Sequence, residues 1–137
     1  MENKHFHRRK GLEKELIIVG LVLVLGHILG SYYHWYDRYF FSDIIVHFAG
    51  GAWVALAALA AFPSLGTGSG FKKSLLSLAL IVLLAGAGWE IFEFTVEHYY
   101  LVNFQGPPLD TLADMIVDLL GGASAALYVK PRDRLFQ

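Results

Sequence analysis

Four long apolar segments constrain this chain more than any other feature of its sequence. They cover residues 16–33, 43–62, 75–98 and 110–129 of the 137 residues. Each has about 20 residues, enough for an α-helix to cross a hydrocarbon layer of roughly 30 Å. The composition, with 55% hydrophobic and only 17% charged residues, is typical of membrane proteins. We therefore predict an all-α fold: a four-helix transmembrane bundle over residues 16–130, with polar tails at 1–15 and 131–137.

The basic residues predict how this bundle is oriented. The chain holds 11 Lys and Arg residues, and all except Arg38 lie in residues 1–15, in the connection 63–74 or in the C-terminal stretch 130–134. Cytoplasmic segments of membrane proteins carry most of the Lys and Arg. We therefore expect both termini in the cytoplasm, a multi-pass location in the cell inner (plasma) membrane, and outer connections at 31–42 and 99–109.

The connections have their own local signals. The Gly- and Ser-rich stretch 63–70 predicts a turn, and 103–108 predicts a short loop followed by Asp110 as a helix cap. The aromatic stretch 32–41 is typical of a membrane–water interface. It could also cover a pocket from the headgroup side.

Acidic and histidine side chains interrupt three of the apolar segments at one depth. Asp43 and His47 begin the second segment, Glu90 and Glu93 end the third, and Asp110, Asp114 and Asp118 begin the fourth. At 1.5 Å per residue, all of them lie within roughly 12 Å of the outer interface. Their spacings of three, four and eight residues place each set on one helical face. Because ionisable residues in a membrane bundle face inward, we expect a shared cavity that opens to the outside.

This predicted cavity gathers more negative charge than a site of low dielectric can keep. Six carboxylates at one level must either be protonated or hold cations between them. Carboxylates and histidine on facing helices are a known way to build a metal site, and an oxygen-rich set with one imidazole suits Mn²⁺, Zn²⁺, Fe²⁺ or Mg²⁺. The absence of cysteine excludes thiolate ligands. We expect a divalent metal held by His47, Glu90, Glu93, Asp114 and Asp118.

Simpler roles stay open for several of these residues. Glu90 and Glu93 could form a hydrogen-bonded structural pair, and His47 could be a satisfied core histidine. His27, alone on its segment, could either pack in the core or orient a ligand. The glycine pairs 50–51 and 121–122, together with Gly86 and Gly88, are more simply devices for close helix packing than ligand contacts.

The order of these residues resembles a known group of proteins. The pattern is Asp43-x3-His47-Phe48-x-Gly50, then Trp89-Glu90-x2-Glu93, then Asp110-x3-Asp114-x3-Asp118-x2-Gly121. It is similar to small bacterial inner-membrane proteins of the YjdF-like group and, more distantly, to VanZ-like proteins, over residues 30–125. The resemblance implies a four-helix integral membrane protein with a polar site near the outer face and a link to the cell envelope. VanZ-like chains also carry a Gln, an Arg and an Asn around the acidic positions. This chain has Glu93 and Asp118 and no matching Arg, so its site is more acidic.

The leading functional hypothesis is a metal-dependent hydrolase or transferase that acts on an envelope lipid or lipid-linked group. In this hypothesis Asp43 and Glu90 are the catalytic residues: Glu90 also holds the ion, and Asp43 orients His47 or acts as general base. Two alternatives remain, a component of cation- or proton-coupled transport and a non-enzymatic assembly subunit. We expect no nucleic-acid partner, and a homo-oligomer is left open.

Overall fold

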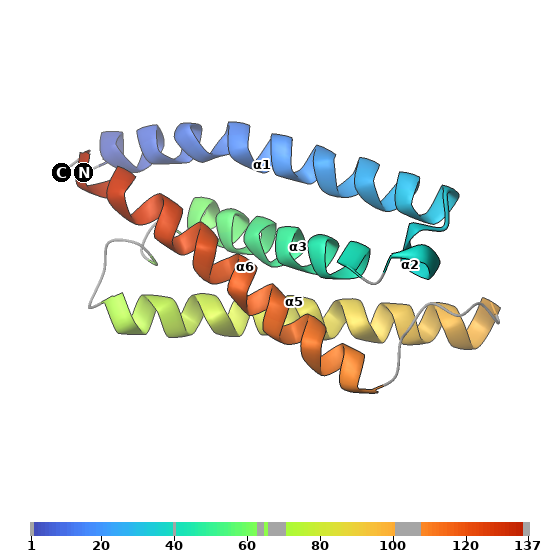
Figure 1. The fold of residues 1–137 in the computed structure, drawn as a ribbon. Helices are drawn as coiled ribbons and strands as arrows, with labels where there is room; N and C mark the ends of the chain where they lie inside the picture. Colours follow the sequence, from blue (N-terminus) through green and yellow to red (C-terminus); the bar gives the residue numbers. More distant parts are fainter. Residues whose placement is uncertain (1, 40, 63–64, 66–70, 101–107, 136–137) are drawn as a thin grey trace.

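Every secondary-structure element in the described part of the chain is helical. The computed structural model describes residues 2–39, 41–62, 65, 71–100 and 108–135. The elements are α1 (Glu2–Tyr32), α2 (Trp35–Arg38), α3 (Phe41–Ala61), α5 (Phe71–Tyr100) and α6 (Pro108–Leu135). Figure 1 shows the long helices side by side, with the start of α1 and the end of α6 at the same end of the molecule.

Four of these helices are long and apolar enough to cross a membrane, which confirms the predicted all-α set of four spans. The spans are Leu12–Tyr32, Phe41–Ala61, Lys73–Tyr99 and Leu109–Val129. Large apolar side chains on their outer surfaces stay more than half exposed, for example Leu21, Leu84 and Leu120. Such surfaces suit lipid rather than water. The cytoplasmic placement of both termini stays a prediction.

Helix α3 lies at the centre of the packing. It packs most closely against α6 and also contacts α1, while α5 packs against both α6 and α3. The buried apolar side chains lie toward the end of the bundle that holds the termini; they are Leu12, Ala55, Leu56, Ala58, Leu59, Leu78, Val82, Ala125 and Val129. The buried polar residues lie toward the other end, so the bundle has an apolar half and a polar half.

The helix ends differ from the sequence-based boundaries. Helix α1 begins at Glu2, so regular helix continues through the predicted tail. Helix α6 begins at Pro108, a residue favoured at the first helical position, so Asp110 lies in the first turn rather than at the cap. The connection after α1 contains the short helix α2. The predicted turn at 63–70, apart from Leu65, and the predicted loop at 103–107 lie outside the described residues.

Candidate functional site

A close crossing of α3 and α6 builds the framework of the site. A Cβ atom added at Gly51 would collide with the backbone of Asp118, and one added at Gly121 would collide with the backbone of Phe48. The two helices therefore touch backbone to backbone, as small residues allow in membranes. Figure 1 shows α6 running obliquely across α3 and α5. This crossing brings the acidic face of α6 beside the first turns of α3.

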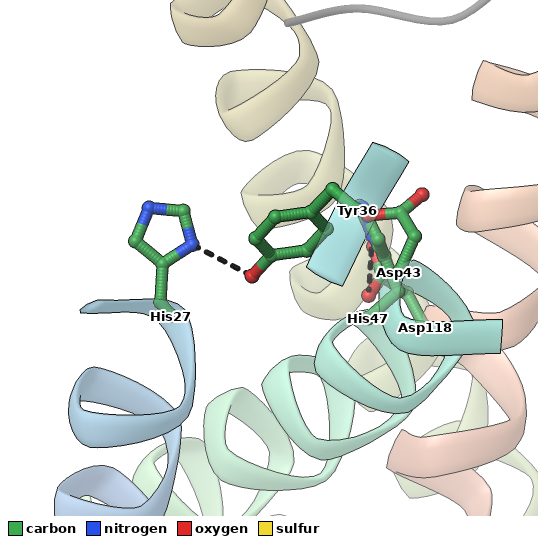
Figure 2. Close-up of polar contacts among 5 residues, drawn as sticks. All are labelled: His27, Tyr36, Asp43, His47 and Asp118. Atoms are coloured by element: carbon green, nitrogen blue, oxygen red, sulfur yellow. Dashed lines mark hydrogen bonds and ion pairs between the residues drawn. The ribbon is translucent and has the colours of Figure 1, made fainter. Parts of the chain in front are cut away.

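His47 is at the centre of the polar half. Its side chain is 5% exposed, and its two ring nitrogens lie within ion-pair distance of carboxylates from different helices. Nδ1 is 3.4 Å from Oδ1 of Asp118 on α6, and Nε2 is 3.6 Å from Oδ1 of Asp43 on α3 itself (Figure 2). The imidazole is thus held between two acids, and each of its nitrogens has a different neighbour.

Two groups of metal-type ligand atoms share this histidine. Asp43, His47 and Asp114 form one, and His47, Glu90 and Glu93 form the other, with one donor atom of each residue within 4.8 Å of the others in its group. Because a donor lies roughly 2.0–2.2 Å from such an ion, two donors of one ion are at most roughly 4.4 Å apart. The side chains would need to close in only slightly to hold an ion.

These groups are largely removed from solvent. His47, Glu90 and Asp114 are buried, with 5–7% of each residue exposed. Asp43 and Glu93 are half-buried at the edge of the cluster. A reacting group could therefore approach from the side of Asp43 and Glu93, while the other donors are held by packing.

The structure thus brings together Asp43, His47, Glu90, Glu93 and Asp114, and it places Asp118 on the other side of the imidazole. The carboxylate of Asp118 lies where a side chain at Gly86 of α5 would be, 2.5 Å from an added Cβ. The sequence predicts Asp118 among the ligands and Asp43 as the residue that orients His47 or acts as general base. The geometry suits the opposite assignment as well, and the ligand and catalytic roles stay predictions.

Tyr36 is a neighbour of the site that the sequence analysis did not single out. Its hydroxyl lies 3.0 Å from Nδ1 of His27 on α1 (Figure 2), and its ring packs over Gly30, 3.0 Å from an added Cβ. Burial, with the negative charges of Asp43 and Glu93, raises the pKa of Tyr36 to about 12. The phenol therefore lies close to the acidic cluster. In the sequence, Tyr36 was indicated only by its place in the aromatic stretch 32–41, which is predicted to cover a pocket.

The chain reaches this position through an unusual backbone conformation. His34 has φ 54° and ψ 43°, the left-handed region that non-glycine residues seldom adopt. This residue reverses the chain after α1 and starts α2, which carries Tyr36 back toward the bundle.

Comparisons with known proteins agree with a membrane location. Residues 4–133 match the family described as "Predicted membrane protein (DUF2238)". The chain is also 29% identical over 131 residues to an uncharacterized protein of Thermotoga maritima, a match that covers 90% of this chain and 67% of that protein. No solved structure matches the chain. The family match supports the expected resemblance to a membrane-protein family, but neither match is named as YjdF-like or VanZ-like. Because the family match covers nearly the whole sequence, the chain belongs to the DUF2238 family of predicted membrane proteins.

Proposed function

We propose that this multi-pass protein of the inner membrane binds a divalent metal. It acts as a metal-dependent hydrolase or transferase on an envelope lipid or lipid-linked group. One observation carries the proposal. A single buried histidine is shared by two groups of carboxylates that come from three different helices, in a chain with four candidate membrane spans.

The electrostatics of the cluster support a bound cation. Five carboxylates, those of Asp43, Glu90, Glu93, Asp114 and Asp118, surround one imidazole in the polar half. Like charges at these separations repel strongly when water is excluded, and ionisable groups within membrane spans are costly unless they are compensated. A dication between the carboxylates would offset this repulsion without protonating them.

The roles of individual residues follow from their positions around His47. A carboxylate that accepts a hydrogen bond from Nδ1–H fixes the tautomer and leaves Nε2 to bind an ion, and Asp118 is placed to do this. Glu90, Glu93 and Asp114 would be the further ligands. Asp43, whose side chain is 34% exposed, is placed to act as general base toward a substrate.

The metal would supply the activation that these side chains lack. A bound divalent ion polarises an ester or phosphoryl oxygen and lowers the pKa of a bound water. His47 and the carboxylates would hold and orient it, and Asp43 would accept the proton from the attacking water or hydroxyl.

Metal analysis of the purified protein tests the binding step. Wild-type protein prepared without chelators should contain a divalent metal, and an Asp114→Asn/Glu90→Gln double variant should lose it. The matched control is Asp110→Asn/Glu97→Gln, which makes the same chemical changes on the same two helices outside both ligand groups. Equal metal content in the two double variants, or no metal in the wild type, would contradict the proposal.

A vesicle assay tests the reaction step. Metal-loaded protein in vesicles of phosphatidylethanolamine and phosphatidylglycerol should form products of ester or phosphoryl cleavage that mass spectrometry detects. Asp43→Asn should retain bound metal but lose these products. Turnover that persists in Asp43→Asn would exclude the proposed base.

A further inference from the structure

A cavity of about 380 Å³ lies beside the candidate site, between α1, α3 and α5. Apolar side chains form most of its wall, among them Leu23 and Val24 of α1, Val54 of α3, and Val82 of α5. Its size lies within the range of roughly 300–1,000 Å³ that is usual for small-molecule sites. The cavity is therefore large enough for part of a ligand and is suited to an apolar one.

The cavity wall is almost entirely apolar, with three ionisable residues among its lining. His47 and Asp118 line it at the level of the ligand groups. Along α3 its lining runs from Val46 to Val54, roughly 12 Å at 1.5 Å per residue, toward the apolar half of the bundle. The indole N–H of Trp53 does not add a polar contact inside, because it donates to the backbone carbonyl of Leu16 at 2.9 Å. This lining suits an apolar chain, and His47 and Asp118 are the site residues that a polar group attached to the chain would meet.

Aromatic contacts close the cavity at the end near α2. The rings of His27 on α1 and Trp89 on α5 meet edge to face, with centroids 5.8 Å apart, and both residues line the cavity. The hydroxyl of Tyr36 forms a hydrogen bond of 3.0 Å with Nδ1 of the same His27 (Figure 2). These contacts join α1 to α5 at the end of the cavity near α2.

The side between α1 and α5 is open. Helix α1 packs on α3, and α5 packs on α6 and α3, so α3 separates the two outer helices. Val24 of α1 and Ala85 of α5 line the cavity and are nevertheless exposed. Both residues lie inside candidate membrane spans, so this opening faces the hydrocarbon of the bilayer.

We propose that the cavity binds one hydrocarbon chain of a membrane lipid, which enters sideways between α1 and α5 and places its polar linkage at His47. The inference rests on the proposed function, since the metal-binding cluster is the group that would act on that linkage. Apolar cavities stay free of water and take up apolar ligands, and a void leaves its lining without dispersion contacts. Lipid chains are the apolar molecules within reach of this opening. His47 is the residue that the cavity lining and the ligand groups share, and a metal held there would complement an ester or phosphate group.

Photocrosslinking of the full chain in vesicles tests this arrangement. The probe is a phosphatidylglycerol with a diazirine in one acyl chain, mixed into vesicles of phosphatidylethanolamine and phosphatidylglycerol. In the wild type, mass spectrometry should locate crosslinks at Val54 and Val82, which face the cavity. Ala85→Trp should fill the opening and reduce these crosslinks by about tenfold or more.

The matched control is Leu84→Trp, one residue away on the same helix. Leu84 is 65% exposed and does not line the cavity, so this variant should keep the wild-type crosslinks. If Ala85→Trp does not fold, as judged by thermal unfolding, Ala85→Leu provides a milder filling with a smaller loss. Crosslinks confined to outward residues such as Leu21, or an equal loss in Leu84→Trp, would overturn the inference.

Metal content measured in the same samples separates the two proposals. Wild-type protein that binds metal but shows no crosslinks at Val54 or Val82 overturns the lipid-chain inference alone. Wild-type protein that shows these crosslinks but contains no metal overturns the proposed function alone.

Discussion

Nδ1 of His47 on α3 lies 3.4 Å from Oδ1 of Asp118 on α6, and both residues are buried. The backbones fix this pairing, since a Cβ atom at Gly51 would collide with the backbone of Asp118. The orientation of the imidazole therefore depends on the helix crossing as much as on the side chains. The pairing distinguishes Asp118, which would orient His47, from the carboxylates that would hold a metal.

Asp118→Asn and Asp114→Asn should affect metal affinity differently. The loss of an orienting carboxylate typically weakens binding by about 10–100-fold, so Asp118→Asn should still bind metal with reduced affinity. Asp114→Asn removes a donor from a ligand group and should abolish stoichiometric binding. Competition with a chelator measures both affinities, with Asp110→Asn as a control for charge. A complete loss in Asp118→Asn together with a mild effect in Asp114→Asn would reverse the two assignments.

Gly121→Ala should destabilise the protein and impair the site. The added Cβ would collide with the backbone of Phe48, next to His47, and forced overpacking typically costs about 1–3 kcal/mol. Thermal unfolding in detergent should show a lower Tm, and the bound metal should decrease. Gly88→Ala on α5 is the control, because an added Cβ there meets nothing within 4 Å. Equal Tm values for the two variants would contradict the close crossing.

Gly20→Ala should loosen the docking of α1 on α3. An added Cβ at Gly20 would lie 2.9 Å from Nε1 of Trp53, the atom that donates to the carbonyl of Leu16. Loss of such a hydrogen bond typically costs about 1 kcal/mol. Gly26→Ala on the same helix has open space around the new Cβ and provides the same gain in helix propensity. The Tm should fall in Gly20→Ala relative to Gly26→Ala, and a Tm that is equal or higher would contradict this role of Trp53.

Helical periodicity and membrane depth made much of this site predictable. Spans of about 20 residues fix the depth of each polar residue, and spacings of three and four fix its face. These two constraints suffice to expect Glu90 and Glu93 to lie opposite His47 and Asp114. Gly51 and Gly121 are confirmed as packing devices, because an added Cβ at either would collide with a backbone, whereas an added Cβ at Gly88 meets nothing within 4 Å and this glycine does not have that role.

Other features depend on geometry that periodicity does not specify. That Asp118 meets Nδ1 of His47 follows from the crossing of α3 and α6, whereas Asp43 meets Nε2 from α3 itself. The position of Tyr36 depends on His34, a non-glycine residue in a left-handed conformation that the sequence gives no reason to expect. The start of α1 at Glu2 was missed because polarity marks where the membrane ends, and not where a helix ends.

Tyr36 provides a spectroscopic test of the polar half. Burial and the charges of Asp43 and Glu93 raise its pKa from 10.0 to about 12. The phenol therefore stays protonated to a higher pH in the folded protein than in the unfolded chain. This contribution to stability is fully present below pH 10 and is lost as the pH rises through about 12. Absorbance of chelator-treated, metal-free protein at alkaline pH, taken as the difference between wild type and Tyr36→Phe, follows this one tyrosine. Asp43→Asn removes a neighbouring negative charge and should lower the pKa of Tyr36, which burial should still keep above its ordinary value.

Asp110→Asn, whose carboxylate is not among the causes of the shift, should leave the pKa of Tyr36 unchanged. The same pKa in wild type and Asp43→Asn would show that Tyr36 does not face the acidic cluster.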